Sequence, residues 1–347
     1  MADFLKNVIS GIENTNILAD GGNSSEFTGT IDTGSYIMNA VLSGSLYGGV
    51  PNNKITAFAG ESATGKTFFV LGVIKQFLDD NETGGVIYFD TEAAVTKDMM
   101  STRGIDVSRV SIAEPESIED FRTSAVKMLT NYMEHKDAPP MMMVLDSLGQ
   151  LSSAKELEDV ESGNPKRDMT KAQLLRGTFR VLSLKLAKAK VPLLVTNHVY
   201  DVVGSYIPMK EMSGGAGLKY ASSSIAMLSK KKDKDGTDVI GNIIKVQMAK
   251  SRFTQENKKV EVKLSYKTGL DRYYGLLDLA EKYDIIKKVS TRYEMPDGTK
   301  LFGKNINEDP AKYFTADIMG RLEVAAKKEF EYGESEGNED GLSVGSE

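Results

Sequence analysis

Short apolar runs recur along the middle of the chain, and several of them end in a polar or acidic residue. The clearest runs cover residues 86–89, 141–145 and 193–195, and a shorter alternating run covers residues 54–59. Uninterrupted apolar runs of about four to eight residues are typical of strands in a parallel sheet that is buried on both faces. Segments with apolar residues at helical spacing follow residue 66 and cover residues 117–133 and 169–189. The pattern predicts an α/β fold with a mostly parallel sheet flanked by helices.

The second half of the chain adds further predicted strands, and two segments without a clear period lie between the predicted elements. Further strands are predicted at residues 224–229, 241–248 and 260–266, and Asp235-Gly236 is a hairpin turn signal between the first and second of them. Residues 154–170 and 199–219 show no clear period, so we expect a long loop in each segment. Loops of that length in a compact domain are usually functional or mobile.

Both ends of the chain differ from the middle part. Near the N-terminus one helical stripe is apolar: Phe4, Leu5, Val8, Ile9 and Ile12. This stripe fits a helix packed on its own domain and equally an arm that docks on a neighbouring subunit. From Glu329 onward seven residues are acidic and none is basic. We expect four parts: an N-terminal helix or arm with a linker (1–29), a core (30–270), a small C-terminal α+β domain (271–330) and an acidic disordered tail (331–347).

The amino-acid composition argues against several kinds of chemical site. The chain has 347 residues, 40% hydrophobic and 27% charged, which is typical of a globular protein. It has no Cys and two His, which argues against disulfides, thiolate chemistry and a classical zinc site, so we expect any metal to be Mg²⁺ held by oxygens. No apolar run is long enough to span a membrane and no signal pattern opens the chain. We therefore expect no membrane partner and a cytoplasmic location.

The net charge of −6 argues mildly against a nucleic-acid partner, because phosphate binding requires Lys and Arg. The acidic tail accounts for this charge, and the rest of the chain is close to neutral. Such a tail is usually a solvated end. A competition between the tail and DNA for a basic surface is a hypothesis that this distribution leaves open.

Residues 60–67 carry the strongest chemical signal. They fit the phosphate-binding P-loop pattern G-x-x-x-x-G-K-[ST] and lie between a strand-like run and a helical segment, as that motif requires. In such a loop backbone N–H groups cradle the phosphates, the lysine reaches the β- and γ-phosphates, and the Ser/Thr hydroxyl binds Mg²⁺. The sequence therefore predicts a site for ATP and Mg²⁺ formed by Gly60, Glu61, Ser62, Ala63, Thr64, Gly65, Lys66 and Thr67.

Acidic and polar residues follow the predicted buried strands, at the edge where open α/β sheets place their chemistry. Asp146 ends the run 141–145 in the Walker B pattern and would hold Mg²⁺ through water. Glu92 comes just after another strand and can activate water in line with the γ-phosphate. His198 also lies at a strand end, where we favour a γ-phosphate sensor over a structural histidine.

The loop 199–219 contains Tyr206 and Lys210 among other aromatic, lysine and glycine residues. That mixture suits base stacking and phosphate contacts with single-stranded DNA. The preceding helix carries Lys171, Arg176, Arg180, Lys185 and Lys188, and a solvated basic face is the simpler explanation above all for Lys185 and Lys188. These motifs indicate an ATP-binding α/β protein and do not identify the process that ATP hydrolysis drives.

In order and spacing, motifs between residues 30 and 330 resemble the RecA family, and within it the branch of T-even-type phages. The matching stretches are 60–67, Phe-Asp-Thr-Glu at 89–92, Leu-Asp-Ser-Leu-Gly-Gln-Leu at 145–151, Asp-Met-Thr-Lys-Ala at 168–172, Thr-Asn-His at 196–198, Gly-Gly at 214–215 and Tyr-Gly-Leu-Leu-Asp at 274–278. The resemblance implies a RecA-like P-loop NTPase core with an N-terminal polymerisation arm and a small C-terminal α+β domain.

This resemblance also implies a function. Members of the family are DNA-dependent ATPases that form helical filaments on single-stranded DNA, bind ATP between subunits and pair the strand with a homologous duplex in recombination and repair. A single-strand binding protein and a loading mediator are expected partners on the same ground. The expected location is the cytoplasm of a bacterium, infected by a phage if the phage branch is correct.

Site residues carry over by position. Lys66 and Thr67 match the phosphate and Mg²⁺ ligands, Glu92 the general base and Asp146 the Walker B acid. The γ-phosphate sensor falls on Asn197 and His198, where other members have glutamine. The resemblance further implies DNA contacts at Arg176, Arg180, Gly214 and Gly215, with Tyr206 and Lys210 in the same loop, and places Lys250 and Arg252 at a neighbour's ATP. Met99 stands where the family stacks a tyrosine on adenine, while Tyr266 can flank the base.

Other functions remain open at the level of sequence. A hexameric helicase built on the same core would translocate along DNA and not pair homologues. The position of Glu92 and the C-terminal unit favour the recombinase. A small-molecule P-loop kinase would be indifferent to DNA and should carry an arginine-rich lid, which we do not find in the sequence.

Overall fold

A computed structural model describes residues 2–12, 15, 29–163, 170–201, 210–267 and 269–333. Within them the main sheet has 10 strands, in the order β12-β11-β10-β9-β3-β7-β6-β4-β5, with β8 paired to β7. The parallel strands are β3 (Ile55–Gly60), β4 (Gly85–Asp90), β5 (Val110–Ala113), β6 (Met141–Asp146), β7 (Leu193–Asp201) and β9 (Ser224–Asp235). The predicted mostly parallel α/β sheet is confirmed.

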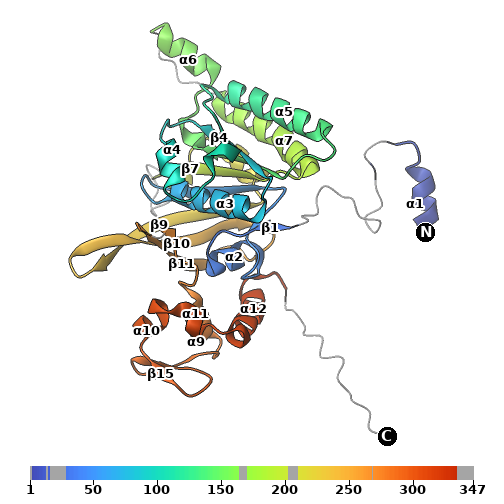
Figure 1. Cartoon of the computed structure of the whole chain (residues 1–347). Coiled ribbons are helices and arrows are strands. Elements are labelled where there is room, and N and C mark those ends of the chain that lie inside the picture. Colours follow the sequence, from blue (N-terminus) through green and yellow to red (C-terminus); the bar gives the residue numbers. More distant parts are fainter. Residues whose placement is uncertain are drawn as a thin grey trace.

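Helices cover both faces of this sheet (Figure 1). One face packs against α3 (Lys66–Asp80), and the other against α5 (Ile118–Glu134) and α7 (Lys171–Ala189). Successive residues of β6 show why the run is apolar throughout, because Val144 belongs to the first apolar cluster and Leu145 to the second. Short helical segments connect the strands: α4 (Lys97–Ser101) and the 3-10 turns Val107–Arg109 and Leu148–Gln150.

Antiparallel strands extend the sheet on one side. They are β10 (Asp238–Ser251), β11 (Lys259–Ser265) and β12 (Gly269–Leu270). Asp235 pairs with Asp238, so the predicted hairpin turn at Asp235-Gly236 is confirmed. The hairpin of β9 and β10 is longer than expected and reaches beyond the helical layers (Figure 1).

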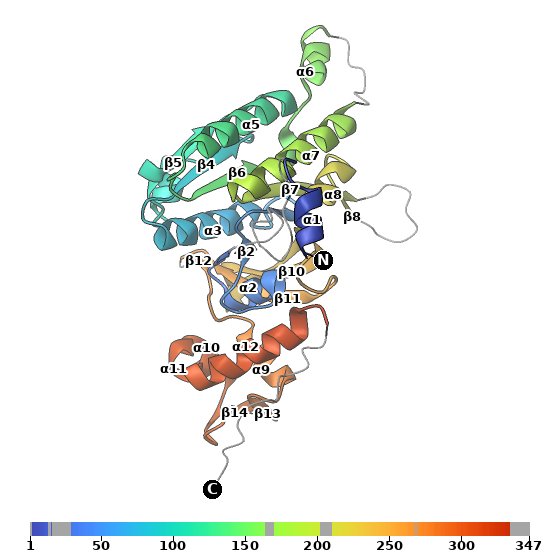
Figure 2. The ribbon, with the colours of Figure 1, turned by 90° about the vertical axis from the view of Figure 1, so that its right-hand side faces the viewer.

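The C-terminal part lies beyond the antiparallel end of the sheet in both views (Figures 1 and 2). It comprises α9 (Leu276–Lys282), the small sheet of β13 (Lys287–Val289), β14 (Arg292–Glu294) and β15 (Lys300–Leu301), and α10 (Gly303–Glu308), α11 (Pro310–Tyr313) and α12 (Ala316–Phe330). Helix α12 packs on α2 (Tyr36–Ser43) of the core. The carboxylate of Glu329 accepts from Lys258 of the core at 2.9 Å and from Lys282 at 2.6 Å, which ties the C-terminal part to the sheet.

At the N-terminus α1 (Ala2–Val8) stands apart from the sheet in Figure 1. Its apolar stripe is exposed, with Phe4 66% and Val8 55% accessible. The strands β1 (Thr30–Ile31) and β2 (Val50–Pro51) then form a small sheet of their own before β3. Among the described residues, no helix combines the length and apolar character that crossing a bilayer requires.

Three expectations need correction. The predicted loop 154–170 begins with α6 (Ala154–Glu161), whose N-cap Ser153 accepts from Glu156 N at 3.0 Å. The predicted loop 199–219 contains the end of β7, strand β8 (Lys210–Met212) and the start of α8 (Ala216–Ala221). The acidic tail starts later than residue 331, because Glu331 bridges to Thr254 and Tyr332 donates to Ser251 O at 3.0 Å. Residues 334–347 lie outside the described part of the chain.

Candidate active site

The P-loop connects the end of β3 to the first turn of α3. Gly60 is packed so closely that a Cβ atom there would lie 2.7 Å from Leu228 O and 2.7 Å from Thr64 Oγ1. Gly65 has φ +94°, a left-handed conformation that glycine adopts without strain. These constraints explain why both positions are glycine. Because α3 begins directly after the loop, its N-terminus faces the phosphate site.

Lys66 is the first residue of α3 and is only 7% exposed. Its ammonium group donates to the carbonyl oxygens of Gly60 at 3.0 Å and Glu61 at 2.8 Å. Burial lowers the pKa of Lys66, although the nearby carboxylates of Glu92 and Asp146 act in the opposite direction. The ammonium group therefore lies within the loop, where it can exchange these carbonyls for phosphate oxygens.

Asp146 ends β6, beside Asp90 of β4, and is 5% exposed. Its Oδ2 atom accepts from Thr67 Oγ1 at 2.8 Å and from the Tyr88 hydroxyl at 2.7 Å, and its Oδ1 atom accepts from Thr196. Burial and Asp146 raise the pKa of Tyr88, so the phenol remains a donor. Thr67 and Asp146 supply hydroxyl and carboxylate oxygens at the start of α3, the ligand types that Mg²⁺ prefers, so these residues fit Mg²⁺.

Glu92 lies just beyond β4, and its Oε1 atom is 2.6 Å from Ser147 Oγ and 2.9 Å from His198 Nε2. Its side chain is 31% exposed and that of His198 16% exposed. Burial alone would raise the pKa of Glu92, but the hydrogen bonds from Ser147 and His198 outweigh it and hold the pKa below its ordinary value. Glu92 is therefore a partly accessible carboxylate that stays ionised at neutral pH.

Asn197 and His198 lie beside the P-loop strand, since Ala59 pairs with Asn197 and Gly60 with His198. The Asn197 amide donates to Ser213 O at 2.9 Å, and Ser213 N donates back to His198 O at 2.9 Å. Ser213 directly precedes Gly214 and Gly215. The structure thus joins the predicted sensor to the predicted DNA loop by hydrogen bonds.

The predicted DNA-contact residues that the structure describes lie on α7, on β8 and in the turn before α8. Arg176 and Arg180 are exposed on α7. Gly214 lies against α7, because a Cβ atom there would be 2.8 Å from Leu175 Cδ1. Lys210 forms an ion pair with Glu61 of the P-loop. Tyr206 lies outside the described residues.

The residues expected to act on a neighbouring subunit lie elsewhere on the sheet. Lys250 donates to the carbonyls at the end of α8, at 2.7 Å to Lys219 O and 2.7 Å to Ser222 O. Burial, followed by the charge of Arg252, lowers the pKa of Lys250. Tyr266, which is predicted to flank the base, is 58% exposed just past β11. Leu264, two residues earlier, has its side chain close to Gly65 of the P-loop.

At the predicted base position, Met99 is partly buried in α4. The Arg103 guanidinium donates to Met99 O at 2.5 Å and lies 4.3 Å from the centre of the Phe68 ring. Phe68 directly follows Thr67, so an apolar and cationic surface stands beside the P-loop helix. Sequence reasoning identified Met99 here and missed Phe68 and Arg103, which carry no motif.

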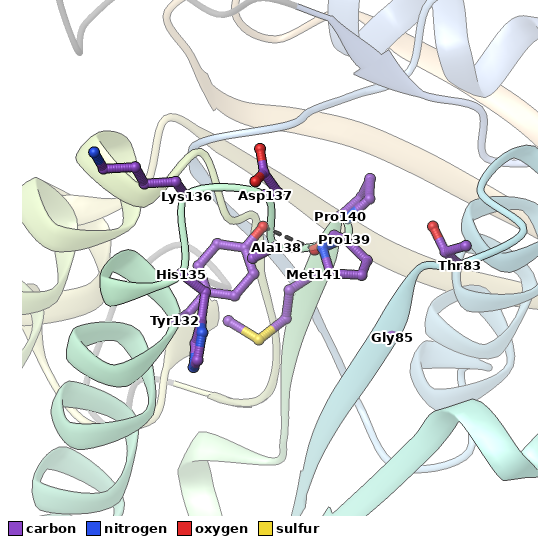
Figure 3. A pocket seen from close by; sticks show the side chains of 10 residues that line it. All are labelled: Thr83, Gly85, Tyr132, His135, Lys136, Asp137, Ala138, Pro139, Pro140 and Met141. Carbon is purple, nitrogen blue, oxygen red and sulfur yellow. Dashed lines mark hydrogen bonds between the residues drawn. The ribbon is translucent and has the colours of Figure 1, made fainter.

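Two cavities lie at different places on the core. The larger, about 980 Å³, adjoins the P-loop and has four lysines among its lining residues: Lys210, Lys219, Lys230 and Lys245. The other, about 590 Å³, lies at the N-terminal ends of β4 and β6, away from Glu92 and Asp146. Figure 3 shows Tyr132, His135 and Met141 side by side in it, with the Tyr132 hydroxyl donating to Pro139 O at 2.9 Å. Among the described residues, none of the predicted site residues lines this second cavity.

Comparison with known proteins gives consistent matches. The family model described as the RecA N-terminal domain matches residues 2–271. The "Recombination and repair protein" of Enterobacteria phage T4 is 28% identical over 252 residues, which are 73% of this chain and 63% of that protein. "Protein RecA" of Chloroherpeton thalassium is 30% identical over 261 residues, 74% of this chain and 69% of that protein. "Protein RecA" of Listeria monocytogenes serotype 4a is 25% identical over 345 residues, 99% of this chain and 94% of that protein.

Proposed function

The chain belongs to the RecA family, and from this premise we propose that it is a DNA-dependent ATPase that exchanges homologous DNA strands. The observation that carries the proposal is the hydrogen-bonded path from Glu92 through His198 and Asn197 to Ser213. This path joins the carboxylate that we propose as the base to the segment that precedes the predicted DNA loop. The names of the matched relatives, a recombination and repair protein and several RecA proteins, support the same function.

For the nucleotide, we propose that the P-loop residues 60–67 hold the phosphates of ATP. Lys66 would exchange its bonds to the loop carbonyls for bonds to the β- and γ-phosphates. Thr67 would bind Mg²⁺ with its hydroxyl oxygen while its hydroxyl proton stays hydrogen-bonded to Asp146. Mg²⁺ supplies charge that offsets the negative charge developing on the phosphate oxygens.

In hydrolysis Glu92 takes the role of the base. Since Ser147 and His198 keep it ionised, Glu92 can accept a hydrogen bond from water and orient that water toward the γ-phosphate. His198 bonds Glu92 and lies beside Gly60, so it is placed to respond to a phosphate in the loop. A response at His198 would reach Ser213 through the bond between its own carbonyl oxygen and Ser213 N.

For DNA, the proposed contacts are Arg176, Arg180, Lys210, Gly214 and Gly215, together with Tyr206 of the undescribed segment. The lysine-lined cavity beside the P-loop supports this assignment, because phosphate binding requires concentrated positive charge. Single-stranded DNA and a homologous duplex are the proposed partners. A single-strand binding protein and a loading mediator are further proposals that rest on family membership.

We also propose that subunits assemble head to tail into a helical filament. The N-terminal arm (1–29) would dock on a neighbour, and the exposed apolar stripe of α1 supports this. Lys250 and Arg252 would approach the ATP of the adjacent subunit, since in this chain Lys250 binds the end of α8 and not the P-loop, and Tyr266 would flank the adenine base. We propose that the rest of the chain divides into the core (30–270) and the C-terminal domain (271–330). The proposed location of the protein is the cytoplasm.

The alternatives receive less support. The three relatives described above are named for recombination and repair or as RecA. The chain also matches over almost the full length of a RecA protein, including the C-terminal part. The recombinase is therefore the function that we propose.

The first test measures ATP hydrolysis with and without single-stranded DNA and examines the same samples by electron microscopy. We expect strong stimulation by DNA together with helical filaments. Stimulation accompanied by closed rings would favour the helicase. If DNA does not stimulate hydrolysis and no filaments or rings form, only the assignment of the nucleotide site would remain. The proposal that the protein is a recombinase would be overturned.

A further inference from the structure

Tyr88 is an unusual residue in the interior of β4. It is fully buried, with 0% exposure, among the apolar side chains that fill one face of the sheet. Phenylalanine would fill almost the same volume in that setting. The hydroxyl group therefore requires a reason other than packing, since a buried polar group costs free energy unless it is hydrogen-bonded.

That reason is visible at the end of the neighbouring strand. Tyr88 pairs with Val144 of β6, and its ring extends along the sheet to the carboxylate of Asp146. An ionised carboxylate only accepts, so the phenol must be the donor in the 2.7 Å bond to Oδ2. Thr196 of β7 donates to the other oxygen, Oδ1.

Asp146 is thus held by hydroxyl groups from three elements: Thr67 of α3, Tyr88 of β4 and Thr196 of β7. Tyr88 and Thr67 share Oδ2, whereas Thr196 fixes Oδ1. A carboxylate bonded at both oxygens cannot rotate without breaking one of these bonds. Its orientation determines where the Thr67 hydroxyl proton points, and so where the lone pairs of that oxygen point.

We propose that Tyr88 and Thr196 are positioning residues that orient Asp146 and Thr67 for Mg²⁺. This inference rests on the proposed function, because Thr67 and Asp146 are its metal residues. Groups that hydrogen-bond metal ligands typically change metal affinity by about 10–100-fold when they are removed. The phenol also offsets part of the free-energy cost of burying Asp146, so its loss should lower the stability of the fold as well.

The test uses Tyr88→Phe, which removes one oxygen atom and keeps the ring. A fluorescent ATP analogue reports binding while Mg²⁺ is titrated, and binding in excess EDTA is measured separately. We expect Tyr88→Phe to raise the Mg²⁺ concentration for half-maximal binding about tenfold, with little change in the EDTA measurement. Thr196→Val should shift the same midpoint in the same direction, and it serves as the second variant if Tyr88→Phe does not fold.

Tyr283→Phe is the matched control. Its phenol donates to the Glu329 carboxylate at 2.8 Å in the C-terminal part, so the same atom is removed from the same kind of bond far from the P-loop. A purely structural role for Tyr88 predicts that both variants melt earlier and that neither shifts the Mg²⁺ midpoint. That result, with Thr196→Val also unshifted, would overturn the inference. If nucleotide binding by the wild-type protein does not depend on Mg²⁺, the proposed function is overturned and the inference fails with it.

Discussion

Lys66 brings a positive charge into a site where the residue is only 7% exposed. Its ammonium group is predicted to be the cation nearest to the β- and γ-phosphates. Removal of a preorganised hydrogen-bond donor that stabilises charge in the transition state typically lowers the rate about 100–1,000-fold. We expect Lys66→Ala to abolish measurable ATP turnover. The measurement is the rate of phosphate release from ATP. Lys258→Ala, which removes a lysine paired with Glu329 at 2.9 Å, should keep turnover. Normal turnover in Lys66→Ala would refute the nucleotide assignment.

Glu92 gives a prediction about pH. Its folded-state pKa is lowered, so the active anion persists to lower pH than an ordinary glutamate, and activity is lost only as pH falls through that lowered pKa. Ser147→Ala removes the 2.6 Å donor, so burial is opposed less and the pKa of Glu92 rises. The acid limb of the hydrolysis rate should therefore move to higher pH in Ser147→Ala. A pH–rate profile that coincides with that of the wild type would show that Ser147 does not control Glu92.

Residues of the site differ in how well the sequence predicts them. Asp146 could be identified because an acid that ends a buried strand after a P-loop has a well-known role. Tyr88 and Thr196 could not, because they lie 58 and 50 positions from Asp146 and their strands are predicted only as apolar runs. Strand register brings them together, and register is set by the whole sheet.

At the scale of elements, the contact between α7 and α8 depends on glycine. A Cβ atom at Gly217 would lie 2.8 Å from Arg176 N, which is backbone and cannot rotate away. We expect Gly217→Ala to destabilise the fold by about 1–3 kcal/mol and to weaken DNA-stimulated hydrolysis, because α8 would be displaced from α7. Denaturant unfolding and ATPase assays measure the two effects.

Gly177 provides the control for that substitution. It lies within α7, close to the same contact, but nothing lies within 4 Å of its added Cβ atom. Alanine favours helix over glycine by about 1 kcal/mol, so Gly177→Ala should be neutral or stabilising. Equal destabilisation by the two substitutions would show that the α7–α8 contact is not the cause.

Lys250 links β10 to the C-terminal end of α8 through the carbonyls of Lys219 and Ser222. In a filament it would also approach the neighbour's nucleotide, so its loss affects both the position of α8 and the shared site. We expect Lys250→Ala to remove most DNA-stimulated hydrolysis while the monomer remains folded by circular dichroism. Lys127→Ala, on the exposed side of α5, should keep the stimulation. Unchanged stimulation in Lys250→Ala would count against an inter-subunit site.

Helix α6 shows how an element can be missed. The segment is polar and lacks an apolar period, so periodicity favours a loop. A local signal was nevertheless present, because Ser153 and Glu156 form the Ser-x-x-Glu pattern of a helix N-terminus. The structure confirms the cap with a 3.0 Å bond from Glu156 N to Ser153 Oγ. Capping signals can therefore identify a solvated helix where apolar spacing cannot.

At the scale of the whole molecule, the parallel sheet was the most predictable feature. Its strands are buried on both faces, so their sequences are continuously apolar and the site residues fall at their ends. The long β9–β10 hairpin was underestimated, because its outer half is rich in lysine and has no core to face. Apolar pattern reports burial, and parts of the molecule that project into solvent leave a weaker pattern.

The N-terminal arm yields the last prediction. The stripe of Phe4, Leu5, Val8 and Ile12 is exposed in the described chain, so its burial must come from another molecule if it contributes to assembly. Deletion of residues 2–12 should abolish filaments in electron microscopy and lower DNA-stimulated hydrolysis, while nucleotide binding by a fluorescent ATP analogue remains, because the P-loop is formed within one subunit.

A pair of single substitutions separates the stripe from the helix that carries it. Val8→Glu places a charge within the apolar stripe, whereas Asn7→Glu adds the same charge to the same helix beside the stripe. We expect the first to prevent filament formation and the second to permit it, since burial of a charge in an apolar contact is costly and a solvated charge is not. Filaments that survive Val8→Glu would show that the arm does not dock through this stripe, and assembly would then have to be attributed to the surfaces of the core.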